Sequence, residues 1–356
     1  MQSQRAYVNA VAGAVPGHDI HAAYVRWAAA RIADPRERAV FERMAERAGI
    51  DHRWSVLPVA PGGGSPVDAG GFYADRLPGT AERMRLYAQE APALALEAIR
   101  SLQEQADLGR ITHLVVASCT GFVAPGVDQI IAGALGLEDV ERTLIGFMGC
   151  YAAAAALRTA HHIVRSDPAA RVLTVTVELS TLHLQVADRL EPLLAELQFG
   201  DGAAAALVTG DPRGLGIVAP FTAALPESGE LIRWTIGDTG FDMVLSGEVP
   251  GRIASALQDE QVLGRLLGEW QVGEVDAWAV HAGGRSILDA VERSLGLGPQ
   301  GLTASRRVLA DHGNMSSSTL MFVLRDLLSQ PAVDRGVAIA FGPGLAAEGF
   351  RFERAP

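Results

Sequence analysis

The sequence predicts an α/β protein whose buried sheets are covered by helices and whose two halves repeat one plan. Unbroken runs of Val, Ala, Ile and Leu alternate with amphipathic segments, which is typical of strands that are buried on both faces. The chain has 356 residues, 49% of them hydrophobic, which allows a large core. Residues 113–137 and 277–297 also share the order apolar strand, small-residue turn, helix and Leu-Gly-Leu.

The repeat continues beyond these two segments. A glycine precedes a further helix in each half, in Gly149-Cys150-Tyr151 and in Gly313-Asn314-Met315, and each helix leads into another apolar strand. An internal duplication accounts for this match, and it predicts an N-terminal half of residues 1–211 and a C-terminal half of residues 212–356. If a twofold axis relates the halves, Cys150 and Asn314 lie at equivalent helix starts that face a shared centre.

The individual elements follow from local signals. Residues 34–53 are predicted to be a helix, with Asp34 as its cap, a proline in its first turn and Gly49 near its end. The glycine-rich segment 60–72 predicts a surface loop within a domain, because apolar patterning resumes on both sides. The apolar runs predict buried strands within residues 113–119, 171–179, 203–210, 277–283 and 336–342.

Composition excludes several functions. The net charge of −11 disfavours a nucleic-acid or anionic-membrane partner. All 30 basic residues are Arg, which excludes lysine Schiff-base chemistry, pyridoxal-phosphate enzymes and P-loop nucleotide hydrolysis. Two cysteines favour a reducing compartment over a disulfide scaffold. We find no secretory signal and no apolar run of ~18 residues, so we expect a cytoplasmic protein with no membrane span.

Cys150, His281 and Asn314 are the candidate catalytic residues. Cys150 precedes a helix of small residues, whose N-terminus can lower a thiol pKa. His281 follows an apolar strand and can accept the thiol proton, and a His and an Asn can both donate to a developing oxyanion or enolate. Each residue also has a simpler interpretation: a buried small hydrophobe, a satisfied core histidine and a helix cap, respectively.

Several segments resemble the signature segments of type III polyketide synthases, the chalcone and stilbene synthase superfamily, and the match to bacterial members is the one we favour. They occur in family order along nearly the whole chain, with the weakest match in residues 1–110. The resemblance implies a thiolase-type αβαβα five-layer fold, a homodimer, and an internal cavity reached by a coenzyme A tunnel. The matching segments are SCTGFVAPGVD, GFMGCY, FGDGAAAALV, WAVHAGG, HGNMSSS and AFGPGLAAEG.

The resemblance also implies roles for the catalytic residues. Cys150 would carry an acyl starter from acyl-CoA and then the growing chain, and His281 would keep the thiol ionised. His281 and Asn314 would bind the thioester carbonyl of malonyl-CoA and favour its decarboxylation. The coenzyme A thioesters are then substrates, and we expect no other cofactor and no metal ion.

The resemblance also implies which residues line the cavity, by their positions in the matching segments. Phe199 matches an aromatic gatekeeper, and Met243 falls at the partner gatekeeper, which is usually Phe. Trp234 falls where chalcone synthases carry a small residue. Five polar residues also match cavity positions: Cys119, Thr120, Ser180, His183 and Ser316. For all of these positions the alternative interpretation is ordinary packing around the site.

The coenzyme A contacts are predicted at the surface. Arg43 and Arg47 match basic residues that hold coenzyme A phosphates, although the first residue of the usual trio is Val40. A solvated helix face is the alternative for this pair. Ser286, next to Arg285, is the third predicted contact. Ala124 falls where plant members place a Met that reaches across the dimer, so this boundary is expected to be open.

Three other protein classes share some of these features. A β-ketoacyl-ACP synthase III-like enzyme is expected to carry a GNTSAAS-like segment and a basic surface, whereas this chain has GNMSSS and a charge of −11. A Cys-His-Asn protease does not require duplicated halves. A non-catalytic coenzyme A-binding module does not require all three catalytic residues. Within the polyketide synthases, Trp234, Met243 and Ala124 favour a starter other than a phenylpropanoid and an alkylresorcinol or alkylpyrone product. The starter, the number of extensions and the cyclisation route stay open.

Overall fold

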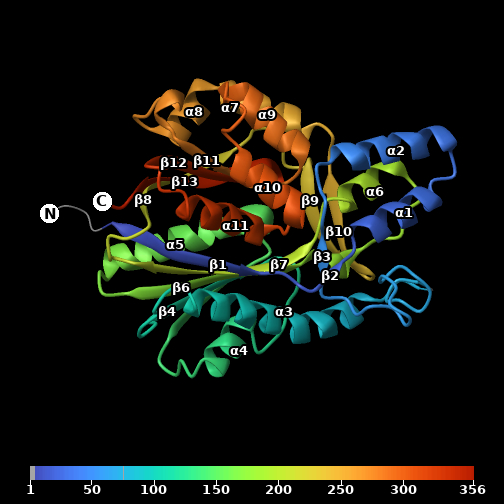
Figure 1. The fold of residues 1–356 in the computed structure, drawn as a ribbon, viewed down its shortest axis with the longest axis horizontal. Helices are drawn as coiled ribbons and strands as arrows, with labels where there is room; N and C mark the ends of the chain where they lie inside the picture. The colour runs from blue at the N-terminus through green and yellow to red at the C-terminus, as the bar shows by residue number, and fades with distance from the viewer. Residues whose placement is uncertain (1–4, 75) are drawn as a thin grey trace.

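The computed structural model describes residues 5–74 and 76–356. A nine-stranded mixed sheet runs through the molecule in the order β11-β12-β13-β8-β1-β7-β6-β4-β5 (Figure 1). The strands are β1 (Ala6–Ala14), β4 (His113–Ser118), β5 (Glu141–Gly146), β6 (Arg171–Leu179), β7 (Asp201–Thr209), β8 (Leu215–Ala224), β11 (Ala277–Val280), β12 (Arg335–Gly342) and β13 (Ala346–Arg354).

The strand order confirms the predicted duplication. In the N-terminal half, β4 is parallel to β6, and β6, β7 and β1 then follow as antiparallel neighbours. In the C-terminal half, β11 is parallel to β12, and β12, β13 and β8 follow in the same manner. Antiparallel pairing of β1 with β8 joins the two sets. The described C-terminal residues provide no counterpart of β5, which pairs with β4 alone.

Figure 1 shows helices and strands in alternating layers, which is the predicted thiolase-like αβαβα arrangement. The central layer consists of α5 (Ala152–Ser166) and α11 (Ser317–Leu328), and both helices contact strands from both halves. A run of buried alanines, 152–156, opens α5 and allows this close packing. The outer layers contain α3 (Thr80–Gln103) and α4 (Val127–Ala134) on one side, and α7 (Val249–Gln258), α8 (Glu260–Leu267) and α9 (Arg285–Leu295) on the other, with α10 (Thr303–His312) beside α11.

Several elements lie outside the repeat, at one end of the molecule (Figure 1). Three helices pack on a small apolar core of their own, and a two-stranded hairpin lies against them. These elements are α1 (His21–Arg31), α2 (Pro35–Arg47), α6 (Leu190–Glu196), β9 (Ile232–Gly237), β10 (Gly240–Leu245), and the short strands β2 (His18–Asp19) and β3 (Trp54–Ser55).

The structure corrects the end of one predicted helix. Asp34 caps α2 as expected, because its side chain accepts hydrogen bonds from the N–H groups of the first turn. The helix, however, ends at Arg47 and does not continue to residue 53. Gly49 adopts a φ of +68°, which leaves the helical conformation. The backbone N–H groups of Asp51 and His52 then both bond to Ala310 O, so a distant segment redirects the chain.

The strand before His281 is confirmed. β11 lies within the predicted residues 277–283 and ends at Val280, so His281 follows it directly. His281 N still donates to Ile339 O at 2.8 Å, and the chain then turns through two glycines into α9. Among the described residues, no helix combines the length and the apolar character needed to cross a bilayer.

Candidate active site

The first functional residues lie just before the two central helices, α5 and α11. Cys150 lies in a short 3-10 turn, Gly149–Tyr151, directly before α5. Gly149 has a φ of +74°, and a Cβ there would lie 2.5 Å from the Pro343 side chain, so only glycine fits. Asn314 and Ser316 lie in the segment that leads into α11, and both side chains interact with the Cys150 thiol. The structure therefore brings the equivalent helix starts of the two halves together.

Burial changes the pKa of the Cys150 thiol more strongly than the helix start does. Loss of hydration raises the pKa of Cys150 to about 12, and the hydrogen bonds of Ser316 and Asn314 only partly offset this effect. The helix start alone therefore does not lower the thiol pKa, because the loss of hydration destabilises the thiolate more than the nearby hydrogen bonds stabilise it.

His281 is a buried imidazole with free nitrogens. Neither ring nitrogen has a hydrogen-bond partner among the described residues, and burial lowers the pKa of His281 to about 3. Gly283 lies close to the ring, since a Cβ there would be 3.4 Å from Nε2. Asn314 Nδ2 donates to Gly283 O at 3.2 Å, which places Asn314 next to the same loop. A neutral ring in this position can both accept and donate a proton.

Asn314 is held from several directions. Its Oδ1 accepts a hydrogen bond from Ser316 N at 2.8 Å, which orients the side-chain amide. Its backbone N–H donates to Gln198 O at 2.7 Å, and its carbonyl accepts from Gly200 N at 3.0 Å. These bonds flank Phe199, so both chain neighbours of the predicted gatekeeper are bonded to the backbone of a predicted catalytic residue.

A buried carboxyl that the sequence analysis missed lies beneath the site. Glu178 Oε2 accepts hydrogen bonds from Cys119 N and Thr120 Oγ1, each at 3.0 Å, and Oε1 accepts one from Ser317. Cys119 Sγ lies 3.2 Å from Ser316 Oγ. Burial raises the pKa of Glu178 to about 7. The available signal was a lone acidic residue near the end of a strand that is made of Val, Leu and Thr after its first residue.

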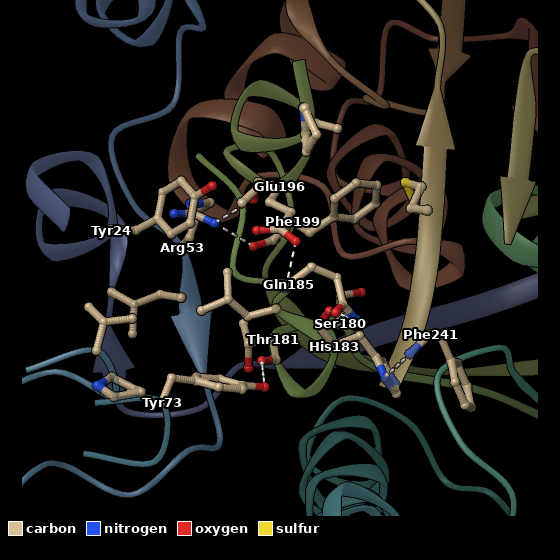
Figure 2. A pocket seen from close by; sticks show the side chains of 18 of the residues that line it. Tyr24, Arg53, Tyr73, Ser180, Thr181, His183, Gln185, Glu196, Phe199 and Phe241 are labelled. Atoms are coloured by element: carbon tan, nitrogen blue, oxygen red, sulfur yellow. Dashed lines mark hydrogen bonds between the residues drawn. The ribbon is translucent and has the colours of Figure 1, made fainter. Parts of the chain in front are cut away.

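Two spaces lie on either side of a shared wall. The space beside Cys150 has a volume of about 20 Å³, enough for about one water molecule. The neighbouring cavity has a volume of about 270 Å³ and a mainly apolar wall (Figure 2). Both spaces are lined by Ser180, Phe199, Trp234 and Met243. The shared wall therefore lies between Cys150 and the larger of the two spaces.

The predicted cavity residues lie around these spaces. Trp234 pairs with Met243 across the β9–β10 hairpin, and Trp234 Nε1 donates to Cys119 O at 3.1 Å. Cys119, Thr120 and Ser316 line the space beside Cys150. The Trp234 indole is therefore hydrogen-bonded to the backbone of Cys119, whose side chain lines the space beside Cys150.

His183 lines only the larger cavity, and its ring is fully engaged. Its Nδ1 accepts a hydrogen bond from Phe241 N at 3.1 Å, so Nε2 carries the proton and donates to Thr120 O at 2.7 Å. The ring also stacks on Phe241 with a centroid distance of 4.1 Å. Burial lowers the pKa of His183 to about 3. His183 therefore forms a rigid, neutral part of the cavity wall and does not act as an acid–base group.

The predicted coenzyme A contacts are on the surface. Arg43 and Arg47 are exposed on one face of α2, and Ser286 is exposed in the first turn of α9. Arg285 Nη1 donates to Arg47 O at 3.0 Å, so the two helices meet here. Within the described part of the chain, Arg43 and Arg47 form no ion pair, and no cluster of three or more His, Cys, Asp or Glu could hold a metal ion.

Comparison with known proteins identifies the family. The model of chalcone and stilbene synthases matches through its N-terminal domain at residues 3–212 and its C-terminal domain at residues 217–355. The alpha-pyrone synthesis polyketide synthase-like Pks18 of Mycobacterium tuberculosis is 34% identical over 90% of this chain and 84% of its own. The bisdemethoxycurcumin synthase of Oryza sativa subsp. japonica is 35% identical over 86% of this chain and 81% of its own.

Solved structures agree with these relatives. The crystal structure of PKS-I from the brown alga Ectocarpus siliculosus has a TM-score of 0.89 and 28% identity, and the match covers 99% of both chains. The C-terminal type III polyketide synthase domain of Steely1 from Dictyostelium has a TM-score of 0.86 and 25% identity, over 99% of this chain and 100% of that domain. The chain thus belongs to the chalcone and stilbene synthase family, and it is a type III polyketide synthase, an acyltransferase-type condensing enzyme.

Proposed function

We propose that the enzyme loads an aliphatic acyl group from acyl-CoA onto Cys150, extends it with malonyl-CoA and cyclises the product to an alkylpyrone or alkylresorcinol. The observation that carries this proposal is the mainly apolar cavity of about 270 Å³ across the wall from Cys150. A cavity of this size approaches the range of small-ligand pockets, and its wall suits a hydrocarbon chain. The printed name of the mycobacterial relative, an alpha-pyrone synthesis protein, supports the pyrone branch.

In the proposed first step, the Cys150 sulfur attacks the starter thioester. The thiol proton passes to His281, whose ring nitrogens are both free, and the coenzyme A thiol leaves with a proton. Because burial favours the neutral thiol and the neutral imidazole, we propose that this proton transfer accompanies the attack on the thioester. An acyl-Cys150 thioester results.

In the proposed second step, malonyl-CoA loses carbon dioxide. The electron pair of the breaking carbon–carbon bond moves onto the thioester carbonyl, and N–H groups of His281 and Asn314 stabilise the enolate oxygen. The enolate carbon then attacks the acyl-Cys150 carbonyl and releases the Cys150 sulfur. Asn314 Nδ2 exchanges its bond to Gly283 O for the substrate oxygen. No cofactor beyond the two thioesters takes part.

The coenzyme A moiety is proposed to lie along α2 and the start of α9. Arg43 and Arg47, which form no ion pair with the residues that the structure describes, supply cations for its phosphates, and Ser286 supplies a hydroxyl at the adjoining helix start. Arg285 ties the two helices together through Arg47 O. We propose the cytoplasm as the location, since both cysteines are free thiols.

A homodimer is proposed through the edge strand β5. This strand is largely exposed, and its outer side has no neighbour among the described strands. Leu144 in β5 and Phe122 in the loop before α4 are exposed large apolar side chains, and Ala124 is exposed in the same loop as Phe122. A second copy of β5 would cover this edge, which otherwise invites aggregation. Sedimentation of the purified protein tests this, since a monomer at all concentrations contradicts it.

Incubation with malonyl-CoA and a panel of acyl-CoA starters tests the reaction. The products are identified by mass, and acyl-Cys150 is detected by intact-protein mass after brief exposure to starter alone. Aliphatic starters are expected to give tri- or tetraketide pyrones or resorcinols. Exclusive use of aromatic starters contradicts the proposed substrate class, and the absence of any acyl-enzyme contradicts the proposed role of Cys150.

A further inference from the structure

Arg53 is a buried cation that is hydrogen-bonded to the backbone around Phe199. The residue is only 2% exposed, and its guanidinium lies 4.6 Å from the centre of the Tyr24 ring (Figure 2). Nη1 donates to Phe199 O at 2.8 Å and to Glu196 O at 3.1 Å, and Nε donates to His21 Nδ1 at 3.0 Å. Burial lowers the pKa of Arg53 to about 10, so the group stays charged at neutral pH. A buried charge thus holds two backbone carbonyls at and just after the end of α6.

Phe199 lies between Arg53 and Asn314. The backbone of Asn314 is bonded to both chain neighbours of Phe199, at 2.7 and 3.0 Å, which is the pattern of a parallel bridge between Phe199 and Asn314. In such a bridge the carbonyl of Phe199 itself points away from Asn314, and here it accepts the hydrogen bond from Arg53. Arg53 therefore takes the place that a further strand would have on the outer side of Phe199.

A second contact connects Arg53 to the chain directly before Asn314. Gly313 has a φ of +66°, and a Cβ there would lie 2.8 Å from Arg53 Cγ and 2.8 Å from Gln198 O. Because Gly313 has no side chain, the aliphatic part of Arg53 can lie against the backbone at this point. Arg53 thus restrains Asn314 in two ways, through the bridge to Phe199 and through packing on Gly313.

The position of Asn314 matters for one of the two proposed steps. In the second step, Asn314 Nδ2 leaves Gly283 O and donates to the enolate oxygen. A displacement of such a donor by about 1 Å can lower a rate about 10²-fold. The first step, as proposed, uses Cys150 and His281 for proton transfer. A shift of the Asn314 backbone is therefore expected to slow decarboxylation much more than starter loading.

We propose that Arg53 is a positioning residue for decarboxylation: it holds the Phe199 segment against Asn314, so that the Asn314 amide is directed at the enolate oxygen. This rests on the proposed role of Asn314 in that step. Arginine suits this position because its guanidinium offers several donors in fixed directions, whereas lysine offers a single ammonium group. Arg53 lies between α2 and β3, outside the repeat, so an added element fixes the geometry of a core residue.

Separate measurement of the two steps tests the proposal. Loading is followed as acyl-Cys150 by intact-protein mass after rapid mixing with acyl-CoA, and decarboxylation is followed as carbon dioxide release from malonyl-CoA without starter. In Arg53→Met, kcat for decarboxylation is expected to fall about 10- to 100-fold. The loading rate and the KM for malonyl-CoA are expected to change less than about threefold. Arg53→Lys keeps the cation and is expected to recover part of the loss.

Arg83 provides the matched control, because it is also a buried arginine that is bonded to backbone carbonyls. It is 0% exposed, and its guanidinium lies 5.2 Å from the centre of the Tyr73 ring. It donates to three carbonyls outside the segment bonded to Asn314, those of Pro78, Leu182 and Leu184. Arg83→Lys is expected to lower Tm about as much as Arg53→Lys does and to leave the ratio of decarboxylation to loading unchanged.

The ratio of decarboxylation to loading decides the outcome. If Arg53→Met does not fold, the ratio in Arg53→Lys decides alone. An equal loss of both steps in the Arg53 variants, or the same change of ratio in Arg83→Lys, overturns the proposal, since either result shows a general effect of a buried arginine. Wild-type protein that performs both steps, with an unchanged ratio in the Arg53 variants, overturns this inference alone. Wild-type protein that performs neither step overturns the proposed reaction and this inference with it.

Discussion

The N-terminal and C-terminal halves follow the same strand order but carry different chemistry. In the N-terminal half, α5 begins after Cys150, and β6 brings the buried Glu178 beneath the site. In the C-terminal half, α11 begins after Asn314, and the equivalent strand β12 ends on small and aromatic residues. The repeat thus supplies a common geometry, two helix starts facing one centre, while each half contributes a different reactive group.

The elements outside the repeat serve another purpose. The large cavity is lined by α1, the segment after β3, α6 with its neighbouring loops, and the β9–β10 hairpin, all of which lack counterparts in the other half among the described residues. The proposed bond-forming residues thus lie in the duplicated core, and the cavity proposed for the starter chain lies among the added elements. Variants in the two regions should separate these roles.

Removal of the core thiol is expected to have the largest effect. Cys150→Ala should lower product formation by about 10³-fold or more, because no covalent carrier remains. Slow decarboxylation of malonyl-CoA should persist through His281 and Asn314. Intact-protein mass and product analysis check both outcomes. Cys119→Ser is the comparison variant and should retain turnover with altered products, whereas full-rate product from Cys150→Ala would contradict the role of Cys150.

The buried carboxyl of the N-terminal half should shift stability with pH. Burial raises the folded-state pKa of Glu178 from 4.5 to about 7, so its favourable contribution is complete below pH 4.5 and is lost as the pH rises through 7. The loss amounts to about 3 kcal/mol. Glu178→Gln should therefore lose less stability than the wild type between pH 5 and pH 8 in urea unfolding. Equal pH dependence in the two proteins would place the ionisation elsewhere, since other buried carboxyls are common to both.

Opening the wall should change specificity and leave catalysis in place. Trp234→Ala is expected to join the two spaces and to raise kcat/KM for dodecanoyl-CoA relative to hexanoyl-CoA by about tenfold, since each methylene contributes to discrimination. Product mass and Tm are measured on one sample. If the products stay the same while stability falls by about 3–5 kcal/mol, the indole is a packing residue and not a wall between the spaces.

The smallest effect is expected at the surface. Arg43→Ala and Arg47→Ala should each raise the KM for malonyl-CoA about three- to tenfold at low salt, with kcat nearly unchanged, because phosphate contacts bind ground and transition states alike. The difference should shrink in 0.5 M salt. Arg100→Ala, an exposed position on α3, serves as the control. An unchanged KM in both variants would move the coenzyme A site, with Arg285 as the next candidate.

The sequence by itself determined the features that local patterns encode. Apolar runs, glycine turns and the Asp34 cap predict the strands and helix starts, because these depend on residues a few positions apart. The shared plan of residues 113–137 and 277–297 predicted the duplication, and therefore the meeting of Cys150 with Asn314. The meeting of these two residues was predictable because, in a layered fold, equivalent helix starts face the same edge of the layers.

Only the tertiary structure decided the features that depend on distant neighbours. The end of α2 is redirected by Ala310, and Arg53 and Glu196 meet although they lie far apart in the chain. The shift of the Cys150 pKa to about 12 reflects burial by both halves, which no short pattern contains. The physical reason is that hydration, cavity shape and unpaired hydrogen bonds are set by all atoms that surround a group, whereas secondary structure is set mainly by those next to it in the chain.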